Sequence, residues 1–148
     1  MTMHDWNKIC CAVDFSASSR AAMERAADLA TRLGSELTLL YVNQAAVAAT
    51  AEAGLSAAEM LEDARREVEP KMDDWRSWAE RVMGRLVRMN IVAGRASEEI
   101  VRFVRAGVFD LLVIGTHARV GIARLVLGSV AEEVQRHASC PVLVVRGG

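Results

Sequence analysis

The chain has 148 residues, of which 52% are hydrophobic and 25% are charged, and its net charge is −1 at pH 7. This size and composition predict a single domain over residues 1–148 that buries its own apolar core. The small net charge argues against a nucleic-acid-binding protein, which needs a basic excess to displace counterions from phosphates. No stretch of about 18 apolar residues suggests a membrane span, and the polar start has no signal-peptide pattern, so we expect a cytoplasmic protein.

Five short apolar runs alternate with helical patterns along the chain. Most of these runs are apolar at consecutive positions, which is typical of parallel strands that helices cover on both faces. The third run carries Arg88 and Asn90 between apolar residues, so we expect it nearer a sheet edge. The predicted strands are residues 9–13, 37–42, 86–92, 111–114 and 142–145.

Helix start and stop signals lie between the predicted strands. The first helix should begin at an N-cap, Ser16 or Ser18, and end at Gly34. An Ala-rich loop is expected over residues 44–54. The next helix should begin at a capping box at residues 56–59 and kink or split at Pro70, which removes a backbone donor.

This alternation predicts an α/β fold with a doubly wound, five-stranded parallel sheet flanked by helices. Cys10 and Cys11 should point to opposite faces of the first strand, because successive side chains alternate. With Cys140 alone in another part of the chain, the cysteines predict neither a disulfide framework nor a metal site. Ligands bind such sheets beyond the carboxyl ends of the strands, where the winding reverses.

Asp14 directly follows the first predicted strand, and the residues after it include serines but form no glycine-rich turn. This excludes the usual nicotinamide-dinucleotide fingerprint. A carboxylate at a strand end can accept a hydrogen bond from a ribose or an adenine, or it can cap the following helix. The sequence leaves both roles of Asp14 open.

The loop after the fourth strand runs from Gly115 to Gly128 without an acidic residue, while His117, Arg119 and Arg124 add cationic groups. Glycines let backbone amides approach a phosphate closely, and a helix N-terminus adds partial positive charge. The pattern therefore predicts an anion site.

A simpler interpretation of this loop needs no ligand. Ser129 could start a capping box with Glu132, and Gly115 could only let the chain leave the sheet. His117 could equally be an ordinary loop histidine.

Several segments together resemble those of a known family, the universal stress proteins, over nearly the full length. They are residues 9–16, 36–42, 110–117, 127–134 and 136–146. The resemblance implies a Rossmann-like fold of the adenine nucleotide alpha hydrolase-like type. It also implies an ATP-binding module of the cytoplasmic stress response that acts as a dimer and is not an enzyme.

In ATP-binding members of that family, the loop reads glycine, two residues, glycine, nine residues, glycine, then serine or threonine. Gly115, Gly128 and Ser129 match this pattern, whereas Ala118 stands at the middle glycine position. The implied ligand is ATP, with or without magnesium. The implied contacts are Val13, Asp14, Phe15 and Val42 around the adenosine, and Gly115, His117, Ala118, Gly128, Ser129 and Val130 around the ribose and phosphates.

Two alternative functions remain at this point. The first is a nucleotide-free dimeric interaction protein that has lost ATP binding through Ala118. The second is a slow nucleotide hydrolase, although the loop offers neither a carboxylate that could position water nor a Walker-type lysine.

Assembly is predicted from the last strand, residues 142–145, which is apolar at every position. A bare apolar edge favours association, so we expect a homodimer that pairs residues 142–146 of two copies. The competing possibility is that a loop or residues 1–7 fold over this edge.

Replacing Ala118 by glycine tests the departure from the family loop. If the position needs a positive φ angle, Ala118→Gly should raise ATP affinity by up to roughly tenfold, the factor that ~1.4 kcal/mol gives. Isothermal titration calorimetry on both proteins measures this. Unchanged or weaker binding would show that Ala118 is not a defect in the loop.

Overall fold

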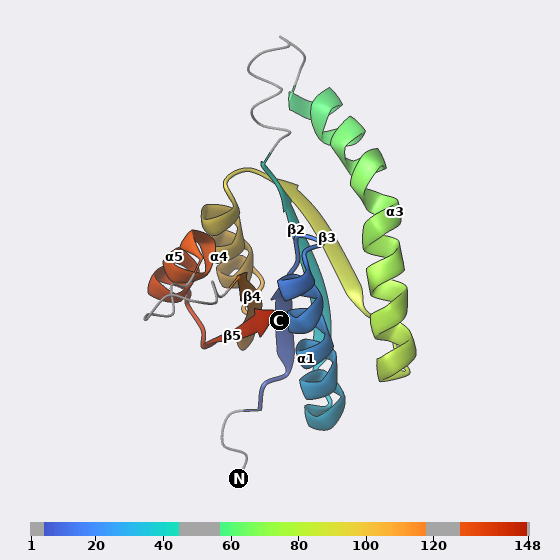
Figure 1. The fold of residues 1–148 in the computed structure, drawn as a ribbon, viewed down its shortest axis with the longest axis vertical. Coiled ribbons are helices and arrows are strands. Elements are labelled where there is room, and N and C mark those ends of the chain that lie inside the picture. Colours follow the sequence, from blue (N-terminus) through green and yellow to red (C-terminus); the bar gives the residue numbers. More distant parts are fainter. Residues whose placement is uncertain (1–4, 45–56, 118–127, 148) are drawn as a thin grey trace.

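The computed structural model describes residues 5–44, 57–117 and 128–147, and strands and helices alternate through them (Figure 1). The sheet is parallel and has the order β3-β2-β1-β4-β5, so the winding reverses between β1 and β4. The predicted α/β doubly wound sheet is confirmed. The strands are β1 (Lys8–Ala12), β2 (Glu36–Asn43), β3 (Arg88–Ala93), β4 (Leu111–His117) and β5 (Val142–Gly147). The helices are α1 (Ala17–Leu33), α3 (Ala57–Met83), α4 (Ala96–Ala106) and α5 (Ser129–His137).

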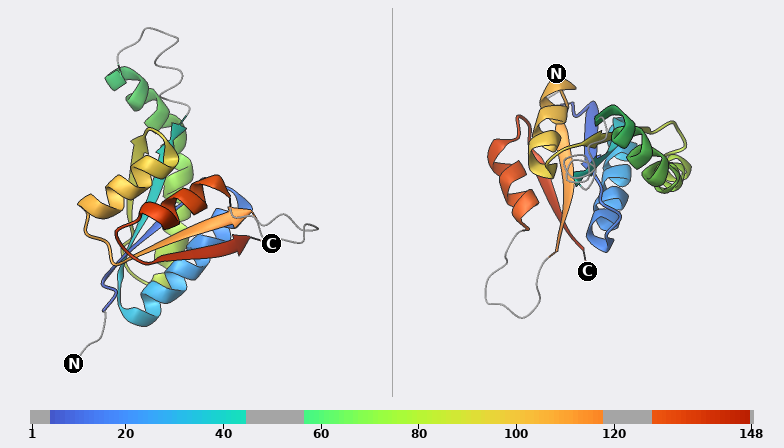
Figure 2. Two further views of the ribbon diagram at one scale, coloured as in Figure 1. Left: turned by 90° about the vertical axis from the view of Figure 1, so that its left-hand side faces the viewer. Right: turned by 90° about the horizontal axis from the view of Figure 1, so that it is seen from above.

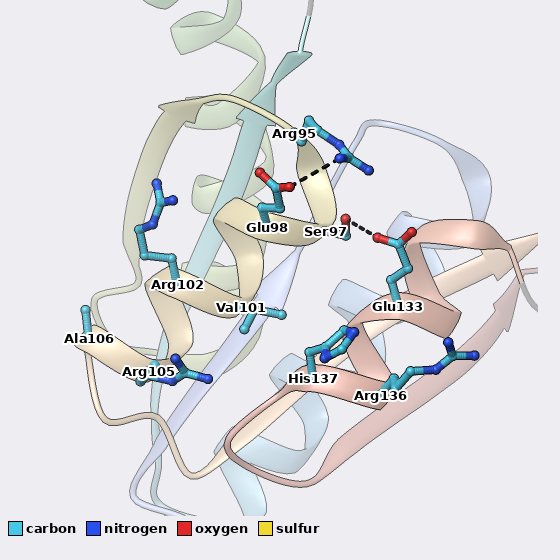
Figure 3. Close-up of a pocket in the computed structure, with 10 residues that line it drawn as sticks. All are labelled: Arg95, Ser97, Glu98, Val101, Arg102, Arg105, Ala106, Glu133, Arg136 and His137. Atoms are coloured by element: carbon cyan, nitrogen blue, oxygen red, sulfur yellow. Dashed lines mark hydrogen bonds and ion pairs between the residues drawn. The ribbon is translucent and has the colours of Figure 1, made fainter.

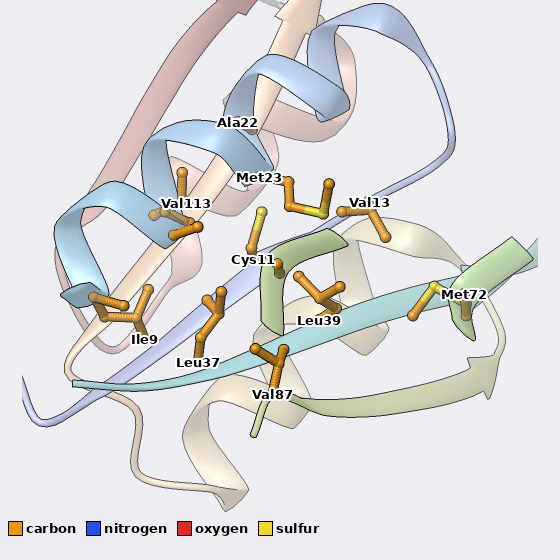
Figure 4. Close-up of a cluster of buried hydrophobic side chains, with 14 of the residues drawn as sticks. Ile9, Cys11, Val13, Ala22, Met23, Leu37, Leu39, Met72, Val87 and Val113 are labelled. Atoms are coloured by element: carbon orange, nitrogen blue, oxygen red, sulfur yellow. The ribbon is translucent and has the colours of Figure 1, made fainter. Parts of the chain in front are cut away.

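Helices cover both faces of the sheet. On one face, Met23 of α1 and Met72 of α3 pack with Cys11 in a buried cluster (Figure 4). On the other face, which α4 and α5 cover (Figure 2), Val104 and Val134 pack with Cys10. The two adjacent cysteines therefore point to opposite faces, as the strand periodicity predicts.

The predicted third strand is shifted by two residues at its start. β3 begins at Arg88, and Leu86 is 86% exposed outside the sheet. The N–H of Val87 donates to Glu80 of α3 at 3.0 Å, which ties this residue to the helix. As expected, β3 is an edge strand.

The ends of α1 follow the predicted signals. Ser16 is the N-cap, and its hydroxyl accepts from the N–H of Ser19 at 3.2 Å. Ser18 lies inside the first turn instead. Gly34 ends the helix in the left-handed conformation with φ 70°, which costs a glycine no steric strain.

Helix α3 is continuous through Pro70, so of the two predicted effects of this proline the split is wrong, whereas the kink stays a prediction. Val68 and Met72 flank Pro70 and are both buried in the core. Their packing holds this part of the helix on the sheet and compensates for the missing backbone donor. Residues 45–56, which include most of the predicted loop and Ser56 of the capping box, lie outside the described residues.

Residues 5–7 do not lie along β5. The N–H of Asn7 donates to Asp110 at 2.9 Å, and its carbonyl accepts from Glu36 at 2.8 Å, both at the amino ends of strands. The proposal that the N-terminal segment covers the β5 edge is therefore wrong for these residues. Residues 1–4 lie outside the described part of the chain.

Candidate functional site at the carboxyl ends of the strands

A cavity of about 260 Å³ lies at the carboxyl ends of β2, β1 and β4, where the winding reverses. This is the position that the strand order predicts for a ligand. Helices α1, α4 and α5 begin around it and complete its wall. Its lining residues are Ala12, Val13, Asp14, Ser18, Ser19, Leu40, Val42, Gln44, Ala96, Ile100, Ile114, Gly115, Thr116, Gly128, Ser129, Val130 and Ala131.

The lining is apolar on one side and polar on the other. Leu40 and Val42 of β2 face Ile100 of α4, whereas Thr116 of β4 and Ser129 of α5 lie beyond the central strand. Two strand spacings, about 10 Å, separate β2 from β4. Among the described lining residues, Asp14 alone carries a charge. The cavity can therefore hold a flat apolar group at one end and a polar or anionic group at the other.

The turn after β1 presents Asp14 to the cavity. The N–H of Val13 still donates to Leu40 of β2 at 2.9 Å, and then the chain leaves the sheet. The carboxylate of Asp14 is exposed and accepts from the N–H of Ser16 at 3.0 Å, while its own N–H donates to the hydroxyl of Ser19 at 3.2 Å. Asp14 therefore supports the turn before α1, but Ser16 holds the N-cap position.

Phe15 does not line the cavity. Its side chain lies on the opposite face of the sheet, with Cys11 and Val13, and its backbone has a φ angle of 66°. There the ring stacks on Tyr41 at 5.0 Å and meets Trp75 of α3 edge-on at 5.3 Å. A left-handed backbone costs a non-glycine residue roughly 1–2 kcal/mol, and the ring contacts offset this cost. The resemblance implied that Phe15 flanks the ligand directly, and the structure places its ring elsewhere.

Gly115 is required by packing. A Cβ atom there would lie 2.8 Å from the backbone nitrogen of Ser19 and still closer to the carbonyl of Ser18. Gly147 on β5 meets the same turn, since its Cβ would lie 2.7 Å from the nitrogen of Ser18. The absence of a side chain at Gly115 and at Gly147 therefore lets the backbone of α1 approach the sheet closely.

The start of α5 contributes backbone donors to the cavity. Gly128 is the N-cap and Ser129 is the first helical residue, so the predicted capping box that begins at Ser129 is not formed. The N–H of Gly128 donates to the hydroxyl of Thr116 at 2.9 Å, and the first intrahelical bond is that of Glu132 to Gly128. The N–H groups from Ser129 onward precede that bond, as at any helix start, and they favour an anion.

Two of the predicted phosphate contacts, His117 and Ala118, have side chains that the structure does not describe. His117 ends β4 and pairs in register with Gly147, and its side chain is outside the described set. Ala118 and the cationic Arg119 and Arg124 fall within residues 118–127, which are also outside it.

Two lining residues that the sequence did not single out organise the rim. The side-chain oxygen of Gln44 accepts from the N–H of Ala96 at 3.2 Å and so caps the start of α4. Thr116 positions Gly128 as described above. Both lie at the ends of predicted strands, so the rule that ligands bind at strand ends could have included them.

A larger cavity, of about 680 Å³, lies between α4 and α5 (Figure 3). Its side chains mostly pair with their neighbours: Ser97 bonds to Glu133 at 2.5 Å, and Arg95 bonds to Glu98 at 3.2 Å. It also lies away from the strand ends. Because ligands bind such sheets at the carboxyl ends of the strands, the smaller cavity is the better candidate site.

Burial in and beside the sheet raises the pKa of two thiols and one phenol. Burial raises the pKa of the Cys10 and Cys11 thiols, which makes them poor nucleophiles. The pKa of the Tyr41 phenol is also raised, mainly by burial and to a smaller extent by the carboxylates of Asp14 and Glu67.

Among the described residues, no group of three or more His, Cys, Asp or Glu side chains could hold a metal ion. No described helix is both long and apolar enough to cross a membrane.

The model of the universal stress protein family matches residues 5–146. The chain belongs to this family. It is 31% identical to universal stress protein MJ0531 of Methanocaldococcus jannaschii, with 95% of this chain and 82% of that protein covered. The solved structure of MJ0577 from the same organism has a TM-score of 0.79 at 29% identity and 96% coverage of each chain.

A third similarity concerns the fold alone. A universal stress protein solved in complex with cAMP has a TM-score of 0.74 at 22% identity, with 97% of this chain and 99% of that chain covered. The universal stress protein described here therefore has the Rossmann-like fold of its family.

Replacing Gly115 tests whether packing requires this glycine. Gly115→Ala should lower the free energy of unfolding by about 3 kcal/mol or more, because the added methyl overlaps the backbone of Ser18 and Ser19. Urea denaturation measures the change. Gly128→Ala is the control, because Gly128 has φ −58° and its Cβ would only touch Thr116 at 3.4 Å. Equal stability of the two variants would contradict the close approach of α1.

Proposed function

We propose that this universal stress protein is a cytoplasmic adenine-nucleotide-binding module that holds ATP in the strand-end cavity and acts as a homodimer. The observation that carries the proposal is the start of α5, where Ser129 and Val130, whose amides no side chain caps, line a cavity with one apolar end. Family membership and the relative solved with cAMP support an adenine nucleotide as the ligand.

The adenine is assigned to the apolar end, between Val42 and the residues that close β1. Val13 and Asp14 lie next to this position, and the carboxylate of Asp14 can accept a hydrogen bond from the ribose hydroxyls. Leu40 and Ile100 supply the apolar surface that a flat base needs.

The phosphates are assigned to the β4–α5 end. Helix N-termini bind phosphate because their first amides have no intrahelical acceptor and the helix dipole adds positive potential. Ser129 and Val130 offer those amides, whereas the amide of Gly128 already donates to Thr116. His117 and Ala118 follow β4 directly and belong to the proposed phosphate contacts through the family loop pattern.

Magnesium, where ATP carries it, would be held through the phosphates. Mg²⁺ usually keeps several waters and takes one or two carboxylates together with substrate phosphates. Asp14 alone supplies a carboxylate among the described lining residues. This lining favours binding over hydrolysis, because it offers no second carboxylate to activate water.

Replacing Gly128 by glutamate tests the phosphate placement. Gly128→Glu puts a side chain and a negative charge at the start of α5, so ATP binding should fall below detection in calorimetry. Gly128→Ala is the matched control and should retain binding, because its methyl fits the observed backbone. If the glutamate variant binds ATP as well as the wild type does, the phosphates lie elsewhere.

The dimer is proposed from the outer edge of β5. The N–H of Leu112 donates to the carbonyl of Pro141 at 3.0 Å, and Leu112 is in register with Val142. Since backbone groups alternate sides along a strand, Val142 and Val144 direct theirs away from β4. β5 is a terminal strand of the sheet, and its apolar residues are only half-buried. Antiparallel pairing of two copies satisfies both edges and closes the assembly.

Replacing Val144 by proline tests this interface. Val144→Pro removes one outward donor but spares the pairing with β4, so the dimer should become a monomer or an aggregate. Val144→Ala keeps the donor and should remain a dimer. Multi-angle light scattering measures both, and a wild-type monomer at micromolar concentration would contradict the interface.

A further inference from the structure

The turn after β1 has two sides that face different parts of the molecule. Asp14 lies on the strand-end cavity, and Phe15, the next residue, packs on the far face of the sheet. Ser16, one residue later, begins the capping of α1. Any change in the backbone at Phe15 therefore moves a wall of the cavity.

The conformation of Phe15 is held by its ring. A φ angle of 66° is unfavourable for a phenylalanine, so it needs a compensating contact. The ring has one in Tyr41, stacked at 5.0 Å with an interplanar angle of 28°. Helix α3 supplies two more, through the edge of Trp75 at 5.3 Å and the ammonium of Lys71 at 5.7 Å from the ring centroid.

We propose that Phe15 is a positioning residue for the nucleotide: its ring, held by Trp75 of α3, keeps the left-handed backbone that presents Asp14 to the cavity. This inference rests on the proposed nucleotide site and adds to it a coupling between α3 and ligand affinity. Trp75 does not line the cavity, and its ring also lies 5.4 Å from the guanidinium of Arg20 on α1. Trp78 shares this contact with Arg20, so a loss of affinity in Trp75→Ala but not in Trp78→Ala is assigned to the contact with Phe15.

Two substitutions at Phe15 separate the ring from the backbone. Phe15→Ala and Phe15→Gly both remove the ring, but only glycine adopts a positive φ without strain. In calorimetric titrations with ATP, Phe15→Ala should bind about tenfold more weakly than the wild type. Phe15→Gly should stay close to wild-type affinity, although both variants lose thermal stability. A residue that only packs the core would give the same affinity in both variants.

Trp75→Ala tests the role of α3. It should weaken ATP binding when residue 15 is phenylalanine and have no effect in the Phe15→Gly protein. Trp78→Ala is the matched control on the same helix, because Trp78 contacts Arg20 at 4.6 Å and its ring makes no described contact with Phe15. It should leave ATP affinity unchanged.

The possible outcomes distinguish this inference from the proposed function. If the wild type binds ATP and Phe15→Ala and Phe15→Gly have the same affinity, the positioning role is wrong while the nucleotide site stands. If the wild type binds no ATP or AMP, the proposed function fails and this inference fails with it. Should Phe15→Ala not fold, Phe15→Leu replaces it, since leucine keeps apolar volume but has the same difficulty with a positive φ.

Discussion

The close contact of the backbone of Ser18 with Gly115 of β4 and Gly147 of β5 determines the geometry of the whole strand-end region. Gly115 and Gly147 have no side chains to prevent it, and alanines on the inner face of α1 let the rest of the helix lie close to the sheet. With α1 in this position, its first turn forms one wall of the cavity, and the chain between β1 and α1 must turn tightly. The location of Asp14 and the strained backbone of Phe15 follow from that tight turn.

The cavity gains its polarity from backbone groups more than from charged side chains. Three helices begin around it, and side chains already satisfy some of their first amides: Ser16 for α1 and Gln44 for α4. At α5, Gly128 is the N-cap and has no side chain, so no side chain caps the amides that follow it. This difference explains why the β4–α5 end suits an anion in a chain whose net charge is −1.

The two edge strands of the sheet, β3 and β5, differ in the polarity of their side chains. β3 carries Arg88 and Asn90 as exposed residues, and Arg88 lies 3.8 Å from Glu36 in an ion pair. Charged and polar side chains at an edge oppose pairing with another strand. β5 carries valines and a leucine from Val142 to Val145, and no such polar residue interrupts them. An association through β5 therefore has a physical basis that β3 lacks.

The sequence by itself determined the fold class and the alternation of strands and helices along the chain, and it indicated the region of the candidate site. Runs of consecutive apolar residues indicate buried parallel strands, and Ser16 and Gly34 mark helix ends, because these signals depend on neighbouring residues only. The tertiary structure alone decided that Phe15 has a left-handed backbone, that Gly115 serves packing against Ser18, and that Ser129 follows the N-cap instead of forming it. Each of these depends on how closely two elements separated in sequence approach each other. Packing over such distances sets φ angles and contacts that no local pattern of residue types encodes.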